Sequence, residues 1–170
     1  MKTLMSQILV AGSLMVWAAQ AAVIVGPNAT LTFEPGRAQL TQESENRLKD
    51  LVRQAKQLGK IDEVKIAAWS DNPTPRENEE LSKADRELAE NRLVAVANCL
   101  KKYKVIDVEA YNMAEKANWL ARTLHTETAE MKAEMARPND IPMFKEEYQV
   151  FKNNGDASKA VVVALVKFRT

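Results

Sequence analysis

The chain has 170 residues, 24 basic and 23 acidic side chains, a formal net charge of +1 and 46% hydrophobic residues. A chain this close to neutral has no basic field to attract nucleic acid or anionic lipid, so we expect neither as a partner. The length is sufficient for one domain to bury a core without disulfides, and Cys99 is the only cysteine. We expect its thiol to act as a small hydrophobic group on a helix.

Residues 1–21 are typical of a secretory signal peptide. Lys2 precedes an apolar run that ends in Ala19-Gln20-Ala21, a small-x-small cleavage site. This run is too short for a comfortable membrane span, which needs about twenty apolar residues, and no other segment approaches that length. We therefore expect a cleaved signal and an exported single domain, residues 22–170, without a transmembrane segment. An uncleaved anchor is the alternative.

The first part of this domain predicts a strand, a helix and a second strand. Alternating apolar residues at 29–33 predict a half-buried strand, which Glu34-Pro35-Gly36 ends. Thr41 is suited to cap a helix whose apolar residues recur at three- and four-residue intervals until Gly59. The second strand is predicted at 64–69, before Ser70-Asp71. The prolines that follow Asp71 require a loop, because proline lacks a main-chain donor.

The second part predicts a long helix, a third strand, extra helices and a last strand. The long helix begins near Asn78 or Ser82 and runs to about Lys102, and the third strand covers 105–111. Aromatic residues and methionines at helical intervals in 117–154 predict two or three short helices, which we expect to pack on the core. The final run, 160–168, is apolar on both faces, as in a strand inside a sheet that is covered on each side.

An aspartate and an arginine stand out in this arrangement. Asp71 follows a strand end, and Arg92 falls in the middle of an apolar stripe of the long helix at about 100° per residue, whereas Arg86 points away from it. The stripe comprises Leu81, Ala84, Leu88, Ala95, Val96 and Cys99. A core-facing arginine needs a partner. Either Asp85 neutralises it two turns earlier on the same face, or Arg92 and Asp71 share a pocket that holds a zwitterionic ligand at both ends.

These residues resemble the OmpA-like family, whose C-terminal domains bind peptidoglycan. The family pattern is strand, Thr-Asp, loop, Asn-x-x-Leu-Ser-x-x-Arg-Ala-x-x-Val, and the chain has Ser70-Asp71 and Asn78-x-x-Leu81-Ser82. Arg92 follows after about seven additional residues, close to two helical turns. The resemblance implies an α+β fold: a βαβαβ two-layer sandwich with a mixed sheet, helices on one face, and extra helices (117–154) inserted before the last strand.

The resemblance also implies a function and a site. The chain would bind peptidoglycan non-covalently in the periplasm, at the cell envelope, through the diaminopimelate residue of the stem peptide. Asp71, next to Ser70, would meet the ammonium group, and Arg92 or Arg86 would meet the carboxylate, while Asn78 shapes the loop. Arg86 lies closer to the family spacing from Asp71. The alternative is a periplasmic structural or partner-binding protein that kept this fold, lost the ligand and binds an envelope protein through residues 117–154.

The sequence contains few residues that could form a catalytic site. His125 is the only histidine, so neither a histidine-based triad nor a multi-histidine metal site is available. Glu146 and Glu147 are neighbours in sequence, do not face each other on a helix, and are expected to be solvated. We therefore expect a binding protein without enzymatic activity, cofactor or metal.

Overall fold

The computed structural model describes residues 22–75, 79–115 and 145–168. The predicted signal peptide, Asn78, His125 and most of the predicted extra helices lie outside this part of the chain. The described elements are β1 (Val23–Thr32), α1 (Gln42–Leu58), β2 (Gly59–Ala68), α2 (Lys83–Lys102), β3 (Val108–Asn112), α5 (Lys145–Asn154) and β4 (Lys159–Phe168). Among the residues described, no helix combines the length and the apolar character needed to cross a membrane.

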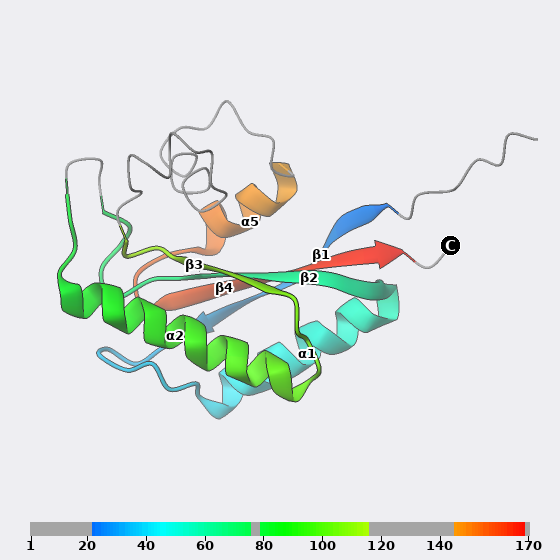
Figure 1. Ribbon diagram of the computed structural model, residues 1–170, viewed down its shortest axis with the longest axis horizontal. Helices are drawn as coiled ribbons and strands as arrows, with labels where there is room; N and C mark the ends of the chain where they lie inside the picture. The colour runs from blue at the N-terminus through cyan, green and yellow to red at the C-terminus, as the bar shows by residue number, and fades with distance from the viewer. Residues whose placement is uncertain (1–21, 76–78, 116–144, 169–170) are drawn as a thin grey trace, which may run out of the picture.

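The four strands form one mixed sheet in the order β1-β4-β2-β3 (Figure 1). β4 is antiparallel to β1 and to β2, and β2 is parallel to β3. Residues 160–166 of β4 are all buried, and they alternate between two cores, with Val162 facing one and Val161 the other. The predicted α+β class with a mixed sheet is therefore confirmed, and so is the position of the last strand inside the sheet.

Helices α1 and α2 pack together on one face of the sheet (Figure 1). Thr41 caps α1 as predicted, since its hydroxyl accepts the N–H of Ser44 at 3.1 Å, and Ser82 caps α2 by accepting the N–H of Asp85 at 3.1 Å. Each helix places an apolar side on the sheet. The buried contributors are Leu48, Leu51, Val52 and Ala55 from α1 and Leu93, Val96, Cys99 and Leu100 from α2.

Helix α5 lies on the opposite face of the sheet (Figure 1). Its Phe151 is buried with Trp69 and Tyr111 and with the second row of β4 side chains. Gly155 follows α5 against the ring of Trp69, where a Cβ atom would collide with the ring. α5 is one of the predicted extra helices before the last strand, and it provides the cover that this strand was expected to have on its second side.

Three boundaries differ from the sequence prediction. β1 begins at Val23, because it pairs with nearly the whole length of β4, from Val23 opposite Lys167 to Thr32 opposite Lys159. β3 begins at Val108, because the segment before it closes α2 through a left-handed residue, Lys104 (φ 64°). β2 begins directly at Gly59, where α1 ends.

The buried side of α2 is shifted from the predicted stripe. Arg92, Val96 and Cys99 are buried as predicted, but Ala84 is exposed. The predicted stripe starts at Leu81, which lies before the first residue of α2. In the structure, the buried residues of α2 begin at Ala89. Arg92 nevertheless belongs to the buried side.

Candidate functional site

The ends of β1 and β2 and the start of β4 lie side by side. Because β4 runs antiparallel to both β1 and β2, the residues that follow those two strands lie beside the residues that precede β4. Phe33 donates its N–H to the carbonyl of Ser158 at 2.9 Å, and Ser158 donates its own N–H to the carbonyl of Ser70 at 2.6 Å. Asp71 is therefore held between the turn after β1 and the residue before β4.

Arg92 enters this junction from α2 and is the largest fully buried side chain among the described residues. Its guanidinium donates to Asp71 Oδ1 at 2.6 Å and to three main-chain carbonyls, those of Trp69 (2.8 Å), Arg37 (3.0 Å) and Glu34 (3.3 Å). Its Cζ atom also lies 4.9 Å from the centroid of the Phe33 ring. One arginine thus connects α2, the end of β2 and the turn after β1.

Asp71 receives hydrogen bonds from three directions. Besides Arg92, the hydroxyl of Ser158 donates to Oδ1 at 2.7 Å, and the N–H of Gly36 donates to Oδ2. Partial burial by itself would raise the pKa of Asp71, but the hydrogen bonds from Arg92, Ser158 and Gly36 outweigh it and lower the pKa below its usual value. The side chain keeps 30% of its surface exposed, whereas Arg92 has none. Asp71 is thus an ionised group that solvent reaches.

Arg92 pairs with Asp71 and not with Asp85, the structural partner that the helix offered. Asp85 accepts hydrogen bonds from the hydroxyl of Ser82 at 2.6 Å and from the side-chain amide of Asn72 at 2.9 Å. These bonds lower its pKa and use it to cap the start of α2. The predicted structural pair between Asp85 and Arg92 is therefore wrong, because the capping interaction occupies the aspartate.

Arg86, the other candidate arginine, pairs with Glu80. Arg86 donates to Glu80 Oε1 at 2.7 Å and to the carbonyl of Leu81 at 2.8 Å, and its side chain is 32% exposed. Its own carbonyl accepts a hydrogen bond from the side-chain amide of Asn112 at 2.9 Å. These contacts hold the segment before α2 against the end of β3, and they direct the Arg86 guanidinium to Glu80 instead of Asp71.

The two remaining predicted site residues are Ser70 and Asn78. Ser70 is fully buried, and its hydroxyl accepts the N–H of Asn72 at 3.0 Å, so it shapes the turn that presents Asp71. Asn78 lies outside the described residues.

Sequence reasoning missed Gly36 and Ser158 as parts of this site. Gly36 was interpreted only as a strand breaker, although a glycine with positive φ (69°) in a tight turn leaves its N–H free to bind an anion. Ser158 also has a positive φ (58°), and it comes 87 residues after Asp71. Only the pairing of β4 with β2 brings Ser158 to Asp71.

A second group of charges lies on the α5 face of the sheet. Lys65 of β2 lies 3.2 Å from Glu109 of β3 and 3.3 Å from Glu147 of α5, and Glu147 is only 1% exposed. Glu147 was expected to be solvated, which is wrong because α5 turns this residue onto the sheet. Burial would lower the pKa of Lys65, but the two glutamates outweigh it and raise the pKa. Within the described part of the chain, no three acidic, cysteine or histidine side chains are arranged to hold a metal ion.

Comparison with known proteins gives neighbours in structure but none in sequence. No family model and no curated protein matches the chain. Similar solved structures include the OmpA-like domain of FopA1 from Francisella tularensis (13% identity, TM-score 0.44, 84% of this chain and 73% of that chain). Another is the periplasmic domain of Helicobacter pylori MotB (17% identity, TM-score 0.43, 86% of this chain and 76% of that chain). Identities and TM-scores this low do not assign a family, so function must be argued from the residues of this chain.

Proposed function

We propose that the chain is an exported, non-catalytic domain that binds peptidoglycan non-covalently, with Asp71 and Arg92 forming a site for the diaminopimelate residue of the stem peptide. The observation that carries this proposal is the contact between Asp71 and Arg92, 2.6 Å apart at the end of β2. Without that contact, the two residues that the OmpA-like resemblance singles out would have no common site. The N-terminal signal-like segment supports export to the compartment where this ligand occurs.

The charges at this site favour a zwitterion over a simple cation. Arg92 neutralises Asp71, so the pair has no net charge and offers a dipole. A ligand centre that carries both an ammonium and a carboxylate group complements both ends of this dipole once the turn at 34–37 has moved away from Arg92, whereas a lone ammonium group uses only the Asp71 end. The diaminopimelate side chain ends in such a centre, and lysine, which lacks the carboxylate, does not.

Asp71 is the group that a ligand meets first. A carboxylate has about four acceptor positions, and Arg92, Ser158 and Gly36 fill three of them. The exposed part of Asp71 leaves one position for an ammonium N–H. Arg92 is fully buried, so in this arrangement it positions Asp71, and a direct bond from Arg92 to a ligand carboxylate requires the turn at 34–37 to move.

The burial of Arg92 favours one other function. Its donors are mostly taken by main-chain carbonyls, as in a structural clamp that joins three elements. A domain that kept the clamp but binds only a protein partner would have these contacts as well. The two functions differ in one respect, because only the first requires a free ammonium group on the cell wall.

Co-sedimentation with purified sacculi tests this requirement without altering the protein. We expect the chain to pellet with sacculi that contain diaminopimelate, and to remain in solution when the free amines of the sacculi have been acetylated. Equal sedimentation with native and acetylated sacculi would contradict the site, and no sedimentation with either would favour the partner-binding function.

An Asp71→Asn variant complements this test but needs a check of its fold. If the amide oxygen replaces Oδ1, the amide NH₂ group faces the N–H of Gly36, so two donors oppose each other. We therefore expect this substitution to cost about 1 to 3 kcal/mol of folding free energy, more than the small effect expected for a fully exposed aspartate. Circular dichroism should be recorded before binding is compared. Asp156→Asn, at a side chain that is 62% exposed, is the matched control.

A further inference from the structure

The end of the sheet where β2 begins has properties that peptidoglycan binding does not use. It lies about 30 Å from Asp71, the length of a ten-residue strand. Large hydrophobic side chains are exposed at four described positions, and three of these are at this end: Leu58, Ile106 and Phe168. Leu58 precedes Gly59, Phe168 pairs with Gly59, and Ile106 is 82% exposed. Of these three residues, Ile106 is the most exposed and lines a hollow at this end of the sheet.

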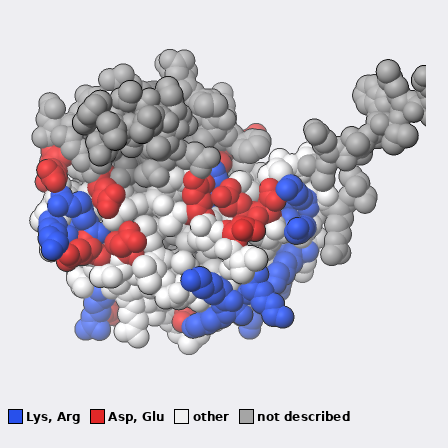
Figure 2. Space-filling model, in the orientation of Figure 1, with Lys and Arg blue, Asp and Glu red and all other residues white. Residues whose placement is uncertain are grey.

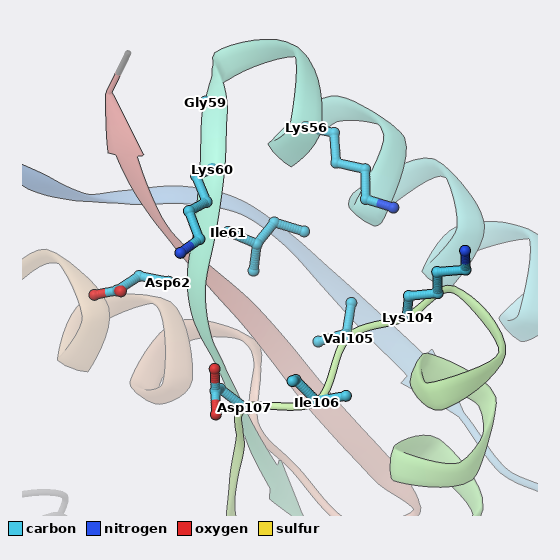
Figure 3. Close-up of a pocket in the computed structure, with 9 residues that line it drawn as sticks. All are labelled: Lys56, Gly59, Lys60, Ile61, Asp62, Lys104, Val105, Ile106 and Asp107. Atoms are coloured by element: carbon cyan, nitrogen blue, oxygen red, sulfur yellow. The ribbon is translucent and has the colours of Figure 1, made fainter. Parts of the chain in front are cut away.

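A hollow of about 510 Å³ lies at this end, between α1, the start of β2 and the segment that leads to β3 (Figure 3). Its apolar lining is Ile61, Val105 and Ile106. Lys56 and Lys104 stand beside these residues on the α1 side, whereas Lys60 and Asp62 extend from the other side of β2 (Figure 3). The hollow therefore joins an apolar surface to two ammonium groups.

The charge around the hollow is positive. Three lysines, Lys56, Lys60 and Lys104, line the hollow against two aspartates, Asp62 and Asp107. Asp62 is paired with Lys167 at 2.6 Å, whereas Lys56 donates to the neutral carbonyl of Tyr103. Basic side chains gather over α1 and the end of α2 in the space-filling view (Figure 2). A ligand with carboxylates on the α1 side complements this surface.

The main chain of β2 is incompletely paired beside the hollow. β2 pairs with β4 from Gly59 onward, but its pairing with β3 begins only at Val64. In the described part of the chain, residues 59–63 therefore have a neighbouring strand on one side only. An extended peptide can use such an edge for main-chain hydrogen bonds, which a lipid surface cannot do.

We propose that this hollow, with the adjoining edge of β2, binds an extended segment of another protein in which carboxylate side chains flank an apolar one. The apolar side chain enters between Ile61 and Ile106, and the carboxylates face Lys56 and Lys104. Lys104 has a positive φ of 64° at the end of α2, a position where glycine is the favoured residue.

The test uses the purified protein and two labelled probes, the peptides Gly-Glu-Leu-Glu-Val-Glu and Gly-Lys-Leu-Lys-Val-Lys. We expect the acidic probe alone to bind and to shift the amide resonances of residues 59–62 and 104–106. Ile106→Asp should weaken binding by about tenfold or more, as loss of a central apolar contact does. Val94→Asp, at the exposed hydrophobic residue on α2, is the matched control and should bind like the unaltered protein.

Lys104→Gly gives a test that cannot be confused with unfolding. Glycine relieves the left-handed strain, so the thermal midpoint should rise while binding of the acidic probe weakens. The proposal is overturned if neither probe binds at about 1 mM, if both bind equally, or if the shifts lie elsewhere. Binding to phosphatidylglycerol vesicles that Ile106→Asp abolishes, without binding of the acidic probe, would overturn it in favour of a membrane surface.

Discussion

Replacement of Arg92 by alanine measures how much the junction at the end of β2 contributes to the fold. The substitution removes the hydrogen bond to Asp71, leaves the carbonyls of Glu34, Arg37 and Trp69 without this donor, and opens a void under Phe33. Breaking a buried charge pair costs about 3 to 5 kcal/mol. Asp71 is partly exposed and keeps two other donors, which places the expected loss near the lower end, at about 3 kcal/mol.

Equilibrium urea denaturation, with the slope checked to be unchanged, measures this loss. Arg86→Ala is the matched control, because its partner Glu80 is 68% exposed and this pair should contribute less than about 1 kcal/mol. A loss below about 1 kcal/mol for Arg92→Ala would refute the reasoning, since it would mean that the buried guanidinium is not a required part of the fold.

Three further predictions concern other contacts. Gly155→Ala places a Cβ atom against the ring of Trp69 and the carbonyl of Phe151, so we expect a loss of about 1 to 3 kcal/mol in thermal unfolding, and an unchanged midpoint would contradict this packing. Ser158→Ala removes one donor from Asp71, so the pKa of Asp71, followed by NMR, should rise toward its ordinary value. Burial raises the pKa of Glu147, against the opposing effect of Lys65, so its contribution to stability is present below the ordinary glutamate pKa and is lost as the pH rises through the raised value. Relative to the unaltered protein, Glu147→Gln should therefore become more stable from about pH 4 to neutrality, and a constant difference between the two stabilities would count against this account.

Local patterns were sufficient to predict the framework of the fold. The alternation in β1, the cap at Thr41 and the apolar run of β4 each depend on neighbours within a few residues. The site was only partly predictable. Helical periodicity identified Arg92 as a buried residue but left open whether it pairs with Asp85 on the same helix or shares a pocket with Asp71. The capping bonds of Asp85 and the contact of Arg92 with Asp71 are long-range or local details that periodicity does not give.

Long-range pairing accounts for what the sequence did not reveal. Ser158 reaches Asp71 across 87 residues, and Gly36 reaches it across 35, through the junction of β1, β2 and β4. Glu147 is a charged residue of the kind that helices usually expose to solvent, but the docking of α5 on the sheet buries it against Lys65. Such contacts depend on the topology of the whole sheet, which no local spacing encodes.

A titration with two stem peptides that differ only at their third residue tests the central claim most directly. Followed by NMR at the amides of Gly36, Asp71 and Ser158, a tripeptide that ends in meso-diaminopimelate should bind with shifts at all three positions. The same peptide with lysine in place of diaminopimelate should bind much more weakly, because it lacks the carboxylate that completes the zwitterion. Equal binding of both peptides, or no shift at these amides with the diaminopimelate peptide at about 1 mM, would contradict the assignment of Asp71 and Arg92 as the ligand site.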